Sequence, residues 1–108
     1  MNTTLNLNEQ LLTLRVPGDF TSTTVETFRN EVNSQLETAK GAASRWNTLQ
    51  IDLGAAKMID SAGLNLIVTW FKRLRLRGAK MRITYSSPNV LRTFIFTRLD
   101  KHIELVKV

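Results

Sequence analysis

The sequence predicts an α/β protein built around a largely parallel sheet. Segments in which apolar and polar residues alternate are interspersed with segments whose apolar residues recur every three or four positions. Glycine or proline lies at several of the boundaries between them, so the connections are expected to be short. Strand–helix–strand units joined by short loops favour right-handed crossovers in a parallel sheet. The 108-residue chain is the length of one domain, and we expect residues 1–108 to form it.

The first half of the chain contains three strand patterns and one helix pattern. Residues 5–7 alternate as a weak edge strand, and residues 12–16 alternate as a half-buried strand that ends at Pro17-Gly18. Residues 49–53 are the third strand, after a loop at 42–47. A helix is expected between the second and third strands, and it should end at Gly41. Its apolar face is Val25, Phe28, Val32, Leu36 and Ala39.

The second half continues with two helices and two strands. A helix is predicted over residues 61–77 and ends at Gly78, and its apolar stripe is Leu64, Ile67, Val68, Phe71 and Leu74. Residues 81–85 alternate as a strand, and Ser87-Pro88 opens a third helix. The inner face of that helix is Val90, Leu91, Phe94 and Ile95. A short strand over 103–106 ends the pattern. Periodicity leaves open whether the helices lie on one face of the sheet or on both.

The composition excludes some kinds of site. The chain has no cysteine, which excludes disulfides, thiolate metal sites and a cysteine nucleophile. It has one histidine, so a histidine-based catalytic centre would depend on His102 alone, and we interpret His102 as a surface residue. Asp52 and Asp60 bracket one loop and could in principle bind a metal, but no other ligand type is nearby in the sequence. We therefore expect neither an enzyme nor a cofactor.

The positive charge lies in the second half of the chain. The net charge is +6; residues 1–56 hold four Lys or Arg against six Asp or Glu, and residues 57–108 hold eleven against three. This asymmetry indicates either an acidic partner or a solvated surface that maintains solubility. A basic nucleic-acid-binding accessory protein is a further alternative, although the sequence has no helix-turn-helix pattern and only one tyrosine.

No targeting or membrane-spanning segment is predicted. Residues 1–10 are polar and have no basic residue before an apolar run. The longest apolar stretch, near residues 64–71, is broken by Asn65 and Thr69 and is far shorter than the roughly 20 residues of a membrane helix. We therefore expect a cytoplasmic protein without direct membrane insertion.

The most informative segment is Met58-Ile59-Asp60-Ser61-Ala62-Gly63-Leu64, at the start of the second predicted helix. In a purely structural interpretation, Asp60 or Ser61 caps the helix, because a side-chain oxygen there accepts hydrogen bonds from free amides. In a functional interpretation, the exposed hydroxyl of Ser61 receives a phosphate, and the added charge repels a docked partner. Asp60 strengthens that repulsion.

This segment, together with Ile51-Asp52-Leu53 before it, resembles the signature of the STAS domain, specifically of bacterial anti-sigma factor antagonists. The resemblance extends over nearly the whole chain and includes Val16–Phe20, Gly78–Met81 and Phe94–Asp100. It implies a mixed sheet of four to five strands with three main helices packed largely on one side.

The resemblance also implies a partner-switching role. Such proteins bind an anti-sigma factor that is also a serine kinase of the histidine-kinase-like ATPase type, and binding frees a sigma factor. The kinase phosphorylates a hydroxyl at the start of the second helix, here Ser61, the antagonist dissociates, and a serine phosphatase restores it. A STAS subunit of a phospholipid-transport ABC complex is the alternative within the same family.

Three positions depart from the family pattern. Many members have a second hydroxyl residue where this chain has Ala62, so Ser61 is the local acceptor. Thr21 stands where the family often has an aspartate, and it could cap the first helix instead. Asn65 stands where a glycine commonly follows Leu64.

The flank of the second helix is expected to contribute to partner binding. Leu66 and Trp70 lie outside the predicted apolar stripe, and they form either an edge of the core or interface anchors. Arg73 follows on the same helix and could meet an acidic patch. The predicted partner-binding residues are Asp60, Ser61, Ala62, Gly63, Leu64, Leu66, Trp70 and Arg73.

Overall fold

Strands and helices alternate in the computed structural model, which describes residues 3–6, 10–37 and 46–108. The strands are β1 (Thr3–Asn6), β2 (Leu11–Arg15), β3 (Thr48–Leu53), β4 (Lys80–Tyr85) and β5 (Glu104–Lys107). The helices are α1 (Val25–Glu37), α2 (Ser61–Leu76) and α3 (Pro88–Phe96), and a 3₁₀ turn, η3 (Leu99–Lys101), precedes β5. The predicted order of elements is confirmed. Leu7, Ala39, Gly41 and most of the predicted loop 42–47 lie outside the described residues.

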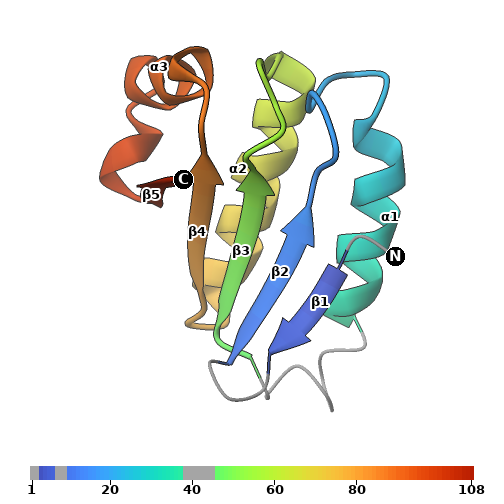
Figure 1. Cartoon of the computed structure of the whole chain (residues 1–108). Helices are drawn as coiled ribbons and strands as arrows, with labels where there is room; N and C mark the ends of the chain where they lie inside the picture. The colour runs from blue at the N-terminus through green and yellow to red at the C-terminus, as the bar shows by residue number, and fades with distance from the viewer. Residues whose placement is uncertain (1–2, 7–9, 38–45) are drawn as a thin grey trace.

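The strands form one sheet in the order β1-β2-β3-β4-β5. β1 is antiparallel to β2, and the other neighbours are parallel. Each crossover from β2 onward advances by one strand in the same direction. Since such crossovers are right-handed, they place their helices on the same face of the sheet, and α1 and α2 lie behind the strands in Figure 1. The mixed sheet with helices packed largely on one side is therefore confirmed.

The core lies between the sheet and the helices. Alternate residues of the three central strands point into it, and all are at most 8% exposed: Leu12, Leu14, Leu49, Ile51, Leu53, Met81, Ile83 and Tyr85. The intervening residues are mostly polar and belong to the opposite face: Thr13, Arg15, Gln50, Asp52, Arg82 and Thr84. The pattern of period two follows from the pleat of the strand, and the sequence therefore identified the buried face of each of these three strands.

The buried face of α2 differs from the prediction. Its buried residues are Gly63, Leu66, Ile67, Trp70 and Leu74, whereas the predicted stripe members Leu64, Val68 and Phe71 are only partly buried. Leu66 and Trp70 are 4% and 0% exposed, so of the two alternatives they belong to the core, and their assignment as partner-binding residues is wrong. The fully buried residues recur at the same spacing of three and four as the predicted stripe, so the buried face of α2 is a stripe of ordinary width that is rotated around the helix from the predicted one.

The remaining segments complete the core. Val90 and Phe94 of α3 are fully buried as predicted, but Ile95 is 51% exposed, so its assignment to the inner face is wrong. Trp46, just before β3, is buried with the Arg77 guanidinium 4.4 Å from the centre of its ring. No helix in the described part of the chain has the length and apolar character needed to cross a membrane.

Candidate functional site

The start of α2 presents an exposed hydroxyl. Asp60 is the N-cap: its backbone is extended, and its Oδ1 accepts a hydrogen bond from the Gly63 amide at 3.0 Å. Ser61 is the first residue of the helix and is exposed. Within the described chain, the Ser61 hydroxyl takes part in no hydrogen bond. The cap therefore uses the aspartate and leaves the serine oxygen free.

Asp60 also connects α2 to the loop before α1. Its Oδ2 accepts a hydrogen bond from the Ser22 amide at 2.9 Å. The Gly63 amide first, and the Ser22 amide next, lower the pKa of Asp60 below the ordinary aspartate value, and partial desolvation opposes them. The carboxylate beside Ser61 is thus held in its charged form at neutral pH.

A second carboxylate makes the reverse connection. Asp19, in the loop before α1, accepts hydrogen bonds at Oδ1 from the amides of Lys57 at 2.8 Å and Met58 at 3.3 Å. Each of the two loops therefore supplies a carboxylate to the amides of the other, an arrangement that we call the reciprocal clamp (Asp19 and Asp60). Sequence reasoning missed Asp19, and its only local signal was its place after Gly18 in a turn.

Thr21 does not cap α1 through its side chain. Its hydroxyl lies 3.0 Å from the Thr23 hydroxyl, and its carbonyl accepts the Val25 amide at 3.0 Å. Thr24 Oγ1 accepts the Thr21 amide at 3.1 Å and donates to the Asp19 carbonyl at 3.0 Å. The loop is therefore closed by Thr24, and the expectation of a capping role for the Thr21 side chain is wrong.

Gly63 allows the two loops to approach closely. A Cβ at this position would lie 2.3 Å from the Phe20 carbonyl oxygen and 2.9 Å from the Phe20 ring. Phe20 forms an isolated parallel bridge with Ile59, and its carbonyl accepts the Asp60 amide at 3.3 Å. Gly63 is therefore a positioning residue in the interior and offers no side chain to a partner. Ala62 and Leu64 on either side of it are partly buried.

The exposed surface of α2 runs from Ser61 through Asn65 and Thr69, one turn apart, to the partly exposed Arg73. Arg73 donates from Nη1 to Asn33 Oδ1 of α1 at 2.9 Å. A groove of about 250 Å³ between α1 and α2 lies along this ridge. The flank that the sequence assigned to Leu66 and Trp70 is thus polar, and Arg73 is the predicted flank residue that reaches it.

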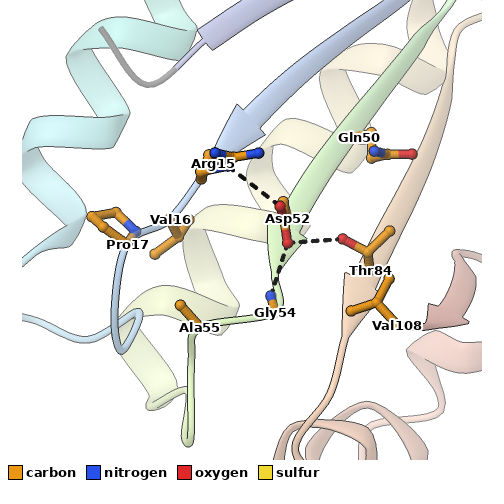
Figure 2. A pocket seen from close by; sticks show the side chains of 9 residues that line it. All are labelled: Arg15, Val16, Pro17, Gln50, Asp52, Gly54, Ala55, Thr84 and Val108. Atoms are coloured by element: carbon orange, nitrogen blue, oxygen red, sulfur yellow. Dashed lines mark hydrogen bonds and ion pairs between the residues drawn. The ribbon is translucent and has the colours of Figure 1, made fainter.

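Asp52 lies on the face of the sheet that the helices leave bare (Figure 2). Its Oδ1 accepts the Gly54 amide at 2.9 Å and the Thr84 hydroxyl at 3.1 Å, and its Oδ2 lies 3.6 Å from Arg15 Nε. A pocket of about 370 Å³ opens beside these residues. Asp52 and Asp60 hold different partners, and the described residues contain no group of three or more side chains placed to hold a metal ion.

His102 is exposed, with its ring centre 6.2 Å from that of Phe71. Its side chain forms no hydrogen bond or ion pair with any other described residue. Among the described residues, its ring is hydrogen-bonded to neither a carboxylate nor a nucleophile, as a catalytic histidine would be.

The architecture defines a class: an open α/β sheet with helices on one face and a free serine hydroxyl at the start of the middle helix. The chain belongs to the STAS domain family, whose model matches residues 2–108.

Solved structures share this fold at low sequence identity. TM1081 of Thermotoga maritima, described as an anti-sigma factor antagonist, superposes with a TM-score of 0.83 and 20% identity, over 98% of this chain and 85% of that one. Unphosphorylated SpoIIAA, an anti-sigma factor antagonist, has a TM-score of 0.76 and 19% identity, over 98% and 87%. SpoIIAA of Bacillus in its phosphorylated form has a TM-score of 0.71 and 16% identity, over 98% and 90%.

Proposed function

We propose that this protein is an anti-sigma factor antagonist that binds an anti-sigma factor and is released when Ser61 is phosphorylated. Membership of the STAS family and the likeness to proteins described as anti-sigma factor antagonists support the general role. One observation carries the specific proposal: the Ser61 hydroxyl is exposed and unbonded within the described chain, at a helix start that a charged Asp60 already caps.

The switch follows from local electrostatics. A phosphate on Ser61 adds about −1.5 to −2 charges at neutral pH. Free amides at a helix start attract phosphate, but the Gly63 amide is already bound to Asp60. The phosphate would therefore lie beside a second negative group, and a partner docked over both would have to desolvate them. A loss of about 3 kcal/mol weakens binding by more than a hundredfold.

The partner in this proposal is an anti-sigma factor with serine kinase activity of the histidine-kinase-like ATPase type. It would contact Asp60, Ser61 and the exposed parts of Ala62 and Leu64, and it would extend along the polar ridge to Arg73. The kinase supplies ATP and magnesium from its own site, and a serine phosphatase reverses the reaction. The antagonist itself contributes only the acceptor hydroxyl and the docking surface.

The experiment incubates the protein with the candidate anti-sigma kinase from the same genome and Mg·ATP, and it maps phosphate by mass spectrometry. Affinity for the kinase is then measured for Ser61→Ala and Ser61→Asp. We expect phosphate on Ser61, near-parental binding for Ser61→Ala, and a loss of about a hundredfold for Ser61→Asp.

Thr27→Asp is the matched control, because Thr27 is exposed on α1 and the substitution adds the same charge away from the cap. It should bind within a few-fold of the parent. Phosphate on another residue of a protein that binds the kinase, or parental affinity in Ser61→Asp, would overturn the proposed switch.

A further inference from the structure

A second recess lies at the opposite end of α2, about 21 Å along the helix from Ser61, as the rise of 1.5 Å per residue to Arg75 indicates. It has a volume of about 480 Å³. Residues from α2, β3, β4 and the segment before β5 line it: Thr48, Phe71, Arg75, Ala79, Lys80, Met81, Arg82, His102 and Glu104. We call this recess the β4 notch.

The β4 notch exists because β5 begins late. β3 pairs with β4 from Lys80 onward, whereas β5 pairs with β4 only from Arg82. Lys80 and Met81 therefore have a neighbouring strand on one side only. Where the missing strand residues would lie, the chain instead passes through η3 and His102 before it enters the sheet. The gap is a consequence of the register and not of loosely packed side chains.

The notch carries excess positive charge. Three cationic side chains, Arg75, Lys80 and Arg82, line it, against one carboxylate. That carboxylate, Glu104, lies 3.3 Å from Arg82 Nε and is partly neutralised by it. Within the described chain, neither Arg75 nor Lys80 forms an ion pair. Two cations that have no ion-pair partner among the described residues thus face one recess, and an anion that enters it would meet both.

Aromatic rings form another wall. The Phe71 and His102 ring centres are 6.2 Å apart and their planes are inclined at 48°. Phe71 is partly buried and His102 is exposed, so both rings are accessible to a ligand in the recess. A planar group placed against them would replace water at apolar surface, while its charged end could reach the cations.

We propose that the β4 notch binds a small organic anion that carries a phosphate and a planar ring. The phosphate lies between Arg75 and Lys80, with Arg82 beyond them, and the ring lies against Phe71 and His102. The volume is within the range of small-molecule sites. Arginine and lysine are the side chains that proteins use for phosphate recognition. This site is independent of the proposed Ser61 switch and requires no protein partner.

Phenyl phosphate is the probe, titrated into the ¹⁵N-labelled full chain and followed by amide chemical shifts. Inorganic phosphate and phenol supply the two halves of the ligand separately. We expect saturable binding of phenyl phosphate with shifts concentrated at Phe71, Lys80, Met81 and His102. Inorganic phosphate should bind at least several-fold more weakly because it lacks the ring contact, and phenol should cause no saturable shifts because it lacks the charge.

Charge-neutralising variants locate the site. Arg75→Gln and Lys80→Gln should each weaken phenyl phosphate binding by about tenfold, as expected for the loss of one hydrogen bond to a charged group. Arg92→Gln and Lys107→Gln are matched controls, because both residues are exposed and do not line the notch. They should leave the affinity within about twofold of the parent.

Three results would overturn the proposal. They are the absence of saturation at millimolar phenyl phosphate, shifts centred on Ser61, and an equal loss of affinity in the Arg92 and Lys107 controls. The last result would show that the affinity depends on net charge alone.

Discussion

The two ends of α2 are held in different ways. At the amino-terminal end, Asp60 accepts the Ser22 amide and the Phe20 carbonyl lies against Gly63, so residues about 40 positions earlier fix the helix start. At the carboxy-terminal end, the chain closes on itself: the Gly78 amide donates to the Arg75 carbonyl at 3.2 Å, and the Ala79 amide donates to the Leu74 carbonyl at 2.9 Å. Tertiary contacts fix the first end, whereas local backbone hydrogen bonds close the last turn of the second, where the Arg77 guanidinium also lies against the Trp46 ring.

This difference bears on function. A substitution at the amino-terminal end of α2 can displace Ser61 by disturbing the reciprocal clamp, even where the substituted residue does not contact a partner. At the carboxy-terminal end, Leu76 is 90% exposed, and a Cβ added to Gly78 would meet nothing within 4 Å. Substitutions there should act on charge and local backbone conformation. The amino-terminal end of α2 thus suits a partner contact that depends on the exact position of Ser61. The carboxy-terminal end suits recognition by charge.

The largest expected effect is that of Trp70→Ala. Trp70 is fully buried, and its ring centre is 6.2 Å from that of Phe20, the residue against which α2 begins. Deleting a buried tryptophan side chain costs about 3–5 kcal/mol. Leu76→Ala, at the exposed end, should change the free energy of unfolding by less than about 0.5 kcal/mol. Urea unfolding measures both. Equal, small effects would show that Trp70 is a surface residue after all.

Trp70 also shows what the sequence could reveal about the fold. The strand patterns predicted the buried face correctly because a period of two allows only two choices. A helix allows a continuous range of rotations, and α2 has apolar residues around more than half of its circumference. Leu64, Val68 and Phe71 were as plausible a stripe as Leu66 and Trp70. Only the position of α2 between its neighbours selects one face, and that position is a property of the assembled layer.

The next effect distinguishes two glycines at the two ends of α2. Gly63→Ala places a Cβ against the Phe20 carbonyl, and overpacking of this kind costs about 2–3 kcal/mol. Gly78→Ala meets no atom but must keep a φ of +73°, which costs about 1 kcal/mol. In urea unfolding, Gly63→Ala should have a lower free energy of unfolding than Gly78→Ala. The reverse order would mean that the loops before α1 and α2 can separate without penalty.

The candidate site was predictable only where it is local in sequence. Asp60, Ser61 and Gly63 form one short segment with a recognisable capping pattern, so the helix start was found. Asp19 acts on the amides of Lys57 and Met58, almost 40 residues away, and no spacing rule connects them. The reciprocal clamp arises because parallel strands β2 and β3 end at the same edge of the sheet. That juxtaposition depends on sheet register, which a single sequence does not specify.

The smallest effect tests the Asp60 half of the reciprocal clamp through pH. Hydrogen bonds, chiefly from the Gly63 and Ser22 amides, lower the pKa of Asp60 in the folded protein, so the unfolded chain takes up the proton at a higher pH. The stabilisation from this carboxylate is therefore complete above the ordinary aspartate range, near pH 4, and is lost as the pH falls through the folded-state pKa. Urea unfolding at several pH values between about 2.5 and 6, a range that brackets the titration of aspartate, measures how the free energy of unfolding changes with pH.

In Asp60→Asn, the side-chain oxygen still caps α2 by accepting the Gly63 amide, but the NH₂ group cannot accept the Ser22 amide. The variant should be slightly less stable than the parent at neutral pH, and its stability should fall less steeply below pH 4. Asp100→Asn is the control, since the Asp100 side chain makes no hydrogen bond or ion pair within the described chain. If Asp60→Asn retains the full parental slope, Asp60 is not the charged link between the two loops, and the amino-terminal end of α2 must be held by the Gly63–Phe20 contact and Asp19 alone.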